Sequence, residues 1–129
     1  MFRFLAAPVL LAMASAVAGG AVAQATTTQA ATTGGAVYRR ACAACHSVEA
    51  GVNRSGPSLA GVAGRPAAAV RGFRYSDVMS GSTTTWTDAA LDAFIANPRG
   101  AMPGNRMAYA GLTKPEDRAA LIQYLRTLR

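Results

Sequence analysis

The chain has 129 residues, enough for one domain, and a formal net charge of +7 from thirteen Lys or Arg against six Asp or Glu. Twelve of the thirteen positive residues are Arg, and this excess favours an acidic partner and an association that weakens with salt. The positive residues are scattered, with no basic tract and no nucleic-acid-binding motif, so we expect no nucleic acid partner.

Residues 1–23 are predicted to be a signal peptide. Arg3 gives a short positive start, residues 5–17 are rich in Ala, Leu and Val, and AVA at 21–23 forms a small-residue cleavage site. Cleavage after Ala23 would remove Arg3, lower the net charge to +6 and release the protein into the periplasm. The alternative is an uncleaved membrane anchor that faces the periplasm, because about 20 uncharged residues can span a bilayer.

The signal segment is followed by residues 24–33 (QATTTQAATT), which are small, polar and without hydrophobic periodicity. We expect a flexible leader there and a folded domain at 34–129. The first helix of the domain is predicted from about residue 35 to 45, with Thr33 able to cap its start.

Glycine and proline interrupt the chain after His46, and short helical turns are predicted at 67–70 and 75–80. A longer helix is predicted to begin at Thr87 and to end before Pro98, since proline pushes its predecessor out of the helical region.

The C-terminal helix has the clearest pattern. Residues 113–116 (TKPE) match a capping box, and Leu121, Leu125 and Leu128 form an apolar stripe beyond it. No segment shows the alternation that is typical of a strand. The sequence therefore predicts an all-α domain.

The chemistry of the chain is concentrated in Cys42-Ala43-Ala44-Cys45-His46, which holds both cysteines and the only histidine. The pattern C-x-x-C-H is typical of c-type haem attachment, in which each thiol forms a thioether and the imidazole ligates iron. A thioredoxin-like redox pair is the alternative, but it belongs near a βαβ pattern that is absent here. A closed structural zinc site needs four ligands, and no other Cys or His is present.

Other short motifs follow CAACH in order. They are GPSL at 56–59, GR at 64–65, Trp86, NP at 97–98, PGNRM at 103–107 and LIQYL at 121–125. Together they resemble the class I c-type cytochromes, especially mitochondrial cytochrome c and its small bacterial periplasmic relatives. The resemblance implies a cytochrome c-like fold whose N- and C-terminal helices pack across each other around one haem c. Gly34 and Tyr38 would then meet Leu121 and Tyr124.

The resemblance also implies the roles of the site residues. His46 is the implied proximal iron ligand, and the carbonyl of Pro57 would accept its other ring proton. Met107 is the implied distal ligand, with Met102 as its rival, and thioether ligation raises the reduction potential. The residues implied to hold a buried haem propionate are Arg65, Tyr75 and Trp86.

Two residues depart from the pattern of these relatives on the distal side. Phe94 stands where a tyrosine often bonds the methionine sulfur, and Met79 stands where an asparagine often supports internal water. We expect a drier distal side and a reduction potential that differs from that of close relatives.

The expected function is a one-electron carrier between redox proteins and not an enzyme, since filled axial positions leave no site for substrate. The alternatives are a haem enzyme or a gas- or peroxide-binding protein with a labile sixth ligand, or the electron-accepting subunit of a dehydrogenase. The expected partners are an oxidase, reductase or dehydrogenase with an acidic docking surface. Cations implied to surround the haem edge are Arg40, Arg99, Arg106 and Lys114.

Overall fold

The computed structural model describes the backbone of residues 20–129 and the side chains of residues 24–26 and 28–129. Its helices are α1 (Gly20–Ala41), α2 (Asp77–Ser80), α3 (Asp88–Ala96), α4 (Pro98–Ala101) and α5 (Pro115–Thr127). Within this part of the chain the only β pairing is an isolated bridge between Pro66 and Thr85, so the predicted all-α class is confirmed. No helix in the described range is both long and apolar enough to cross a membrane.

Helix α1 begins much earlier than predicted, at Gly20 rather than at about residue 35, and Thr33 lies inside the helix instead of capping it. Residues 20–33 contain no proline and are rich in alanine, the residue with the highest helix propensity. The hydroxyls of Thr28 and Thr32 donate to carbonyl oxygens four residues earlier, each at 2.9 Å. The backbone of the expected leader is therefore helical. Most of the predicted signal peptide, residues 1–19, lies outside the described residues.

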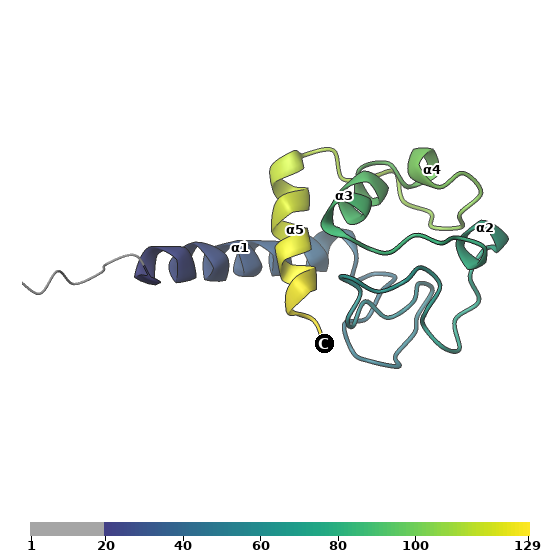
Figure 1. Ribbon diagram of the computed structural model, residues 1–129, viewed down its shortest axis with the longest axis horizontal. Helices are drawn as coiled ribbons and strands as arrows, with labels where there is room; N and C mark the ends of the chain where they lie inside the picture. Colours follow the sequence, from purple (N-terminus) through teal and green to yellow (C-terminus); the bar gives the residue numbers. More distant parts are fainter. Residues whose placement is uncertain (1–19) are drawn as a thin grey trace, which may run out of the picture.

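Burial along α1 begins at Gly34, where the helix crosses α5 (Figure 1). A Cβ placed on Gly34 would lie 2.0 Å from the carbonyl oxygen of Ala120 and 2.7 Å from Cβ of Tyr124. The two backbones therefore approach as closely as a missing side chain allows. Beside this contact Val37 is fully buried, and the rings of Tyr38 and Tyr124 lie 5.6 Å apart. The predicted crossing of the first and last helices is confirmed.

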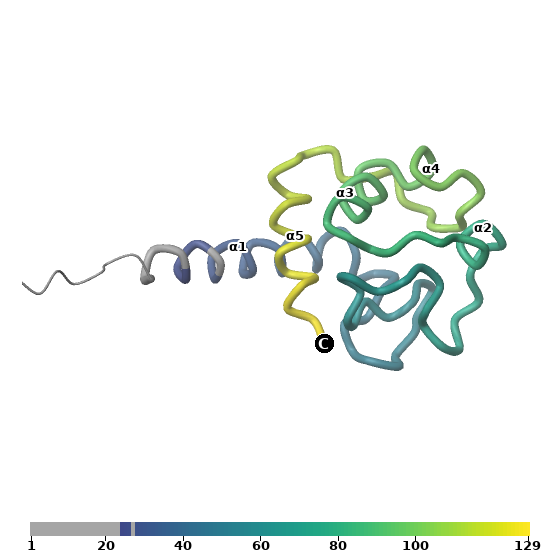
Figure 2. Tube along the Cα trace, viewed as in Figure 1, coloured from purple at the N-terminus to yellow at the C-terminus, as the bar shows by residue number. Residues whose placement is uncertain are grey.

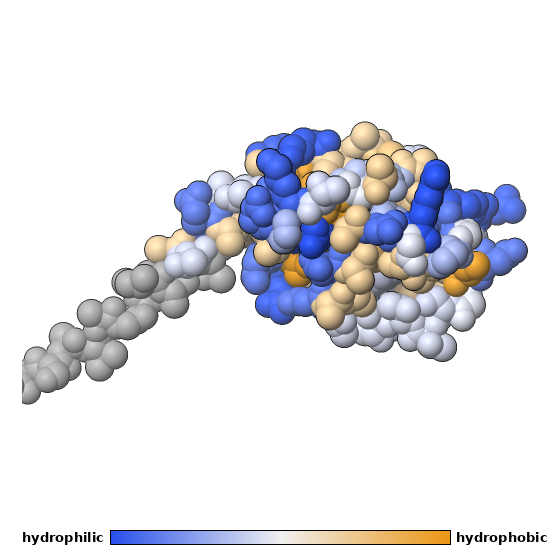
Figure 3. Space-filling model, turned by 90° about the horizontal axis from the view of Figure 1, so that it is seen from above, coloured by the Kyte–Doolittle hydropathy of each residue, from blue (hydrophilic) through white to orange (hydrophobic). Residues whose placement is uncertain are grey.

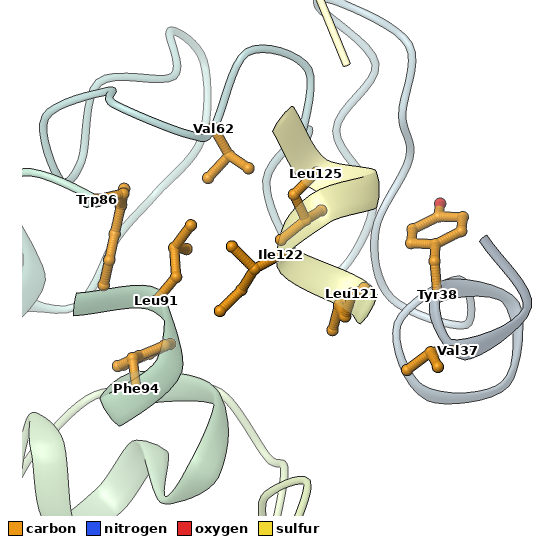
Figure 4. Close-up of a cluster of buried hydrophobic side chains, with 9 residues drawn as sticks. All are labelled: Val37, Tyr38, Val62, Trp86, Leu91, Phe94, Leu121, Ile122 and Leu125. Carbon is orange, nitrogen blue, oxygen red and sulfur yellow. The ribbon is translucent and has the colours of Figure 1, made fainter. Parts of the chain in front are cut away.

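The core lies between α1, α3 and α5 (Figure 4). Leu91 and Phe94 on α3 face Leu121, Ile122 and Leu125 on α5. The ring of Trp86 extends this layer and lies 5.0 Å from the ring of Phe94. This contact places Phe94 in the apolar core.

Irregular chain forms the rest of the body. Figure 2 shows residues 42–76 as a series of loops on the side of the molecule opposite α3 and α4. The helical turn predicted at 67–70 is wrong, because the amide of Ala67 donates to Thr84 across the bridge. Ala68 follows with φ +58°, a left-handed conformation that interrupts a helix. The turn predicted at 75–80 is confirmed as α2, which the hydroxyl of Ser76 caps.

The N-termini of the two longer C-terminal helices differ in how they are capped. Helix α3 begins at Asp88, one residue after the predicted start, and Thr87 caps it: its hydroxyl accepts from the amide of Ala90 at 3.2 Å. The capping box predicted at 113–116 is wrong: Pro115 occupies the first helical turn, so Lys114 becomes the cap and makes no side-chain hydrogen bond. The carbonyl of Thr113 instead accepts from Arg118.

We predict that Gly34→Ala destabilises the holoprotein by about 1–3 kcal/mol, because the new methyl group would overlap the backbone of α5. Gly35→Ala is the matched control: its methyl group would lie 3.5 Å from the ring of Tyr124, an ordinary contact, and alanine favours the helix. Urea unfolding of both variants checks this. Equal stability of the two variants would contradict the close approach at Gly34.

Candidate haem-binding site

The cysteine–histidine motif lies in a tight turn directly after α1. The amide of Cys42 donates to Tyr38 at 2.8 Å and continues the helical bonding, while the amides of Cys45 and His46 both donate to the carbonyl of Cys42 at 3.0 Å. The hydroxyl of Tyr38 donates to the carbonyl of His46 at 2.7 Å and ties the end of the turn back to the helix. The rigid end of α1 therefore positions all three side chains of the motif.

Both thiols are free, with Cys42 half-buried and Cys45 exposed. Burial, and to a smaller extent the neighbouring Cys45, raises the pKa of the Cys42 thiol to about 11. Nucleophilic redox cysteines need the opposite environment, one that lowers the pKa. The surroundings of Cys42 thus disfavour a thioredoxin-like pair.

The imidazole of His46 is oriented from one side by backbone. Its Nδ1 lies 2.8 Å from the carbonyl oxygen of Pro57, which is the hydrogen bond predicted from the sequence. A carbonyl can only accept, so Nδ1 carries the proton and the lone pair of Nε2 is left for a metal. Gly56 packs directly on the ring: a Cβ there would lie 2.4 Å from Cε1.

Arg65 is a half-buried cation with an incomplete set of partners. Its guanidinium donates to the carbonyls of Ala60 at 2.6 Å and Ser58 at 3.1 Å, but its buried Nε has no partner among the described residues. Burial lowers the pKa of Arg65, so the charge is poorly solvated. An anionic oxygen at Nε would complete the site.

The other two residues implied to hold a propionate lie beside Arg65. The amide of Trp86 donates to the carbonyl of Arg65 at 2.9 Å, so the two residues belong to adjacent extended segments. Tyr75 lies close enough to raise the pKa of Arg65, and its hydroxyl accepts from the amide of Val70 at 3.2 Å. Both residues are therefore neighbours of the half-buried Arg65, Trp86 through its backbone and Tyr75 through its side chain.

All three methionines outside the predicted signal peptide, Met79, Met102 and Met107, are half-buried and pack against the core. Packing alone does not distinguish the expected ligand Met107 from Met102. The amide of Met107, however, donates to the side chain of Asn105 at 2.9 Å. From the sequence alone we assign no role to Asn105, although it is a polar residue only two positions before the expected ligand Met107.

These residues fit a covalently bound haem. The site offers what this group requires: two free thiols, one available imidazole nitrogen, a half-buried thioether, and a half-buried guanidinium whose buried Nε has no partner among the described residues. The described part of the chain contains no cluster of three His, Cys, Asp or Glu that could hold a metal ion by itself.

Comparison with known proteins agrees with this fit. The family model "Cytochrome c" matches residues 31–129. Cytochrome c2 iso-2 of Magnetospirillum fulvum is 53% identical over 87 residues, which cover 67% of this chain and 91% of that protein. Cytochrome c of Chlamydomonas reinhardtii is 42% identical over 91 residues, or 70% of this chain and 81% of that protein.

A solved structure gives the same result for the fold. Cytochrome cH from Methylobacterium extorquens superposes with a TM-score of 0.71 at 35% sequence identity, covering 75% of this chain and 97% of that one. The chain therefore belongs to the cytochrome c family, and its cofactor is one haem c joined covalently to Cys42 and Cys45.

Proposed function

We propose that this electron-transport protein is a one-electron carrier whose haem iron is ligated by His46 and Met107. One observation carries the proposal. Nδ1 of His46, the only histidine, donates to the carbonyl of Pro57, and Nε2 therefore stays available to bind iron. Met107 supports it, since this half-buried thioether packs against the same core and lies in a loop held by its own hydrogen bond. If His46 and Met107 both bound the iron, no coordination site would be left for a substrate.

When bound, the haem supplies reversible one-electron chemistry, and the residues around it would adjust its reduction potential. A neutral, soft thioether from Met107 would favour the reduced iron, while the hydrogen bond from His46 to Pro57 makes the imidazole a stronger donor. Arg65 would neutralise a buried carboxylate. Phe94 contributes no hydroxyl to the core, in line with the drier distal side expected from the sequence.

Three arginines that reach α5 or extend from it are neutralised by aspartates. Arg40 pairs with Asp117 at 2.5 Å, Arg118 pairs with Asp92 at 2.7 Å, and Arg126 pairs with Asp88. Half of the six acidic residues of the chain are used in this way. Arg40 is thus a weaker docking cation than the sequence suggested.

The remaining implied cations are better placed for a partner. Arg99 and Lys114 are exposed and form no ion pair among the described residues, and Arg106 donates to the carbonyls of Arg74 and Tyr75 while its charge stays uncompensated. Arg99 also lines a hollow of about 420 Å³ with Tyr109. Figure 3 shows hydrophilic side chains at both ends of the face it draws.

We propose docking to an acidic redox protein through Arg99, Arg106 and Lys114. We also propose export to the periplasm through residues 1–23, with cleavage after Ala23 and retention as an anchor as the alternative.

Met107→Leu should abolish the thioether-to-iron charge-transfer band of the ferric holoprotein and allow fast cyanide binding. Met102→Leu is the matched control and should keep the band, because both residues are half-buried against the core. Visible spectra and cyanide mixing kinetics measure both effects. Loss of the band in Met102→Leu alone would identify the rival ligand, and fast cyanide binding by the wild type would favour a haem enzyme or sensor.

Gly56→Ala should displace the imidazole of His46, because the new methyl group would overlap the ring. We expect a loss of about 1–3 kcal/mol of stability and a high-spin component in the ferric spectrum. Gly35→Ala, which adds the same methyl group at a tolerant position, should leave the spectrum unchanged. A wild-type spectrum for Gly56→Ala would contradict the packing of Gly56 on the ligand.

Arg99→Gln should slow electron transfer to an acidic redox partner at low salt, and the difference from wild type should disappear as salt screens the charge. Arg126→Gln removes the same charge from an ion pair with Asp88 and should have a smaller effect. Stopped-flow rates over a range of ionic strength measure this. Equal effects of the two substitutions would mean that net charge, and not a docking surface, controls association.

A further inference from the structure

The side chain of Asn105 forms an unusually complete set of hydrogen bonds for a loop residue. Its Nδ2 donates to the carbonyl oxygens of Pro98 and Met102, each at 2.8 Å, and its Oδ1 accepts from the amide of Met107 at 2.9 Å. The orientation of the carboxamide follows from its partners, because two carbonyls can only accept and an amide can only donate. Every bond joins the side chain to backbone, so it constrains the course of the chain directly.

The two accepting carbonyls belong to Pro98, the first residue of α4, and to Met102, which caps the end of that helix. This helix has only four residues, and its final carbonyls lack partners within the helix. The amide of Met102 returns to Pro98 at 3.0 Å and the amide of Asn105 returns to Met102 at 3.1 Å, which closes a turn. The carboxamide of Asn105 adds a second hydrogen bond to each of these two carbonyls and so holds the turn in place.

The same carboxamide connects this turn to Met107. The segment between them contains Gly104, whose φ of +88° is a conformation that favours glycine. A Cβ there would also lie 3.1 Å from Cγ1 of Val78, so the segment passes close to α2. Asn105 is the described residue that bonds both to the end of α4 and to the backbone of Met107.

We propose that Asn105 is a positioning residue that holds the backbone of Met107 in its ligating position and thereby keeps the sixth coordination site of the iron closed. The proposal rests on the proposed ligation by Met107. Asn105 itself does not touch the iron. Loss of its carboxamide would leave the Met107 amide without its partner and would remove the second hydrogen bond of the Pro98 and Met102 carbonyls, so the open form of the loop would become more populated.

The test uses the ferric holoprotein and cyanide as the probe of the open form. Asn105→Ala should raise the rate of cyanide binding roughly tenfold or more and weaken the thioether-to-iron charge-transfer band. Asn53→Ala is the matched control. Its side chain also bonds only to backbone, accepting from Ser58 at 3.0 Å and donating to Arg71 at 3.2 Å, in a loop that does not carry Met107. It should lower global stability without changing the band or the cyanide rate.

The outcomes separate the two proposals. A wild type without the charge-transfer band overturns both, whereas a wild type with the band and an Asn105→Ala variant that binds cyanide at the wild-type rate overturns only the role of Asn105. Equal acceleration in Asn53→Ala also overturns it, since the effect would then follow general stability.

If Asn105→Ala fails to fold, hydrogen exchange of backbone amides in the wild-type holoprotein tests the role of Asn105 instead. The Met107 amide should exchange more slowly than the neighbouring Ala108 amide, because it donates to Asn105. Equal exchange at both amides would overturn the proposal.

Discussion

The contact between α1 and α5 at Gly34 is the constraint on which the rest of the molecule depends. Because Gly34 has no side chain, the backbone of α1 comes close to the carbonyl of Ala120. Val37 and Leu121 are buried beside this contact. The crossing fixes the direction of α1, and Cys42 follows its last residue directly. A backbone contact without any reactive group therefore determines where the haem-attachment motif lies.

The loops opposite this crossing are held mainly by hydrogen bonds from side chains to backbone. Arg65 and Asn53 bond to the backbone of loops, and Asn105 bonds to the two ends of the short helix α4 and to the amide of Met107. Such bonds suit a small domain with few bulky side chains, because each satisfies backbone groups that no helix or sheet would pair. The one buried side-chain nitrogen or oxygen that the described residues leave without a partner is Nε of Arg65, and we propose that a haem propionate binds there.

The sequence predicted the chemistry of this molecule better than its helix boundaries. CAACH depends on residue identity and local spacing, which a sequence displays directly, and the resemblance to the class I c-type cytochromes implied the contact between His46 and Pro57. The start of α1 could not be located, because an alanine- and threonine-rich segment is compatible with both helix and loop, and the choice depends on continuity with the buried part of the helix. The capping box before α5 failed because Pro115 shifts the helix start by one residue. Asn105 was missed because its partners, the carbonyls of Pro98 and Met102, become neighbours only when α4 has formed.

We propose that His46 and Met107 both bind the iron and so restrict the protein to electron transfer. X-ray absorption at the iron edge of the ferric holoprotein tests it most directly, because sulfur and nitrogen scatter distinguishably. We expect the wild-type spectrum to show one sulfur ligand alongside nitrogen ligands. This sulfur ligand should remain in Met102→Leu and be absent in Met107→Leu. A wild-type iron bound only by nitrogen and oxygen would contradict it.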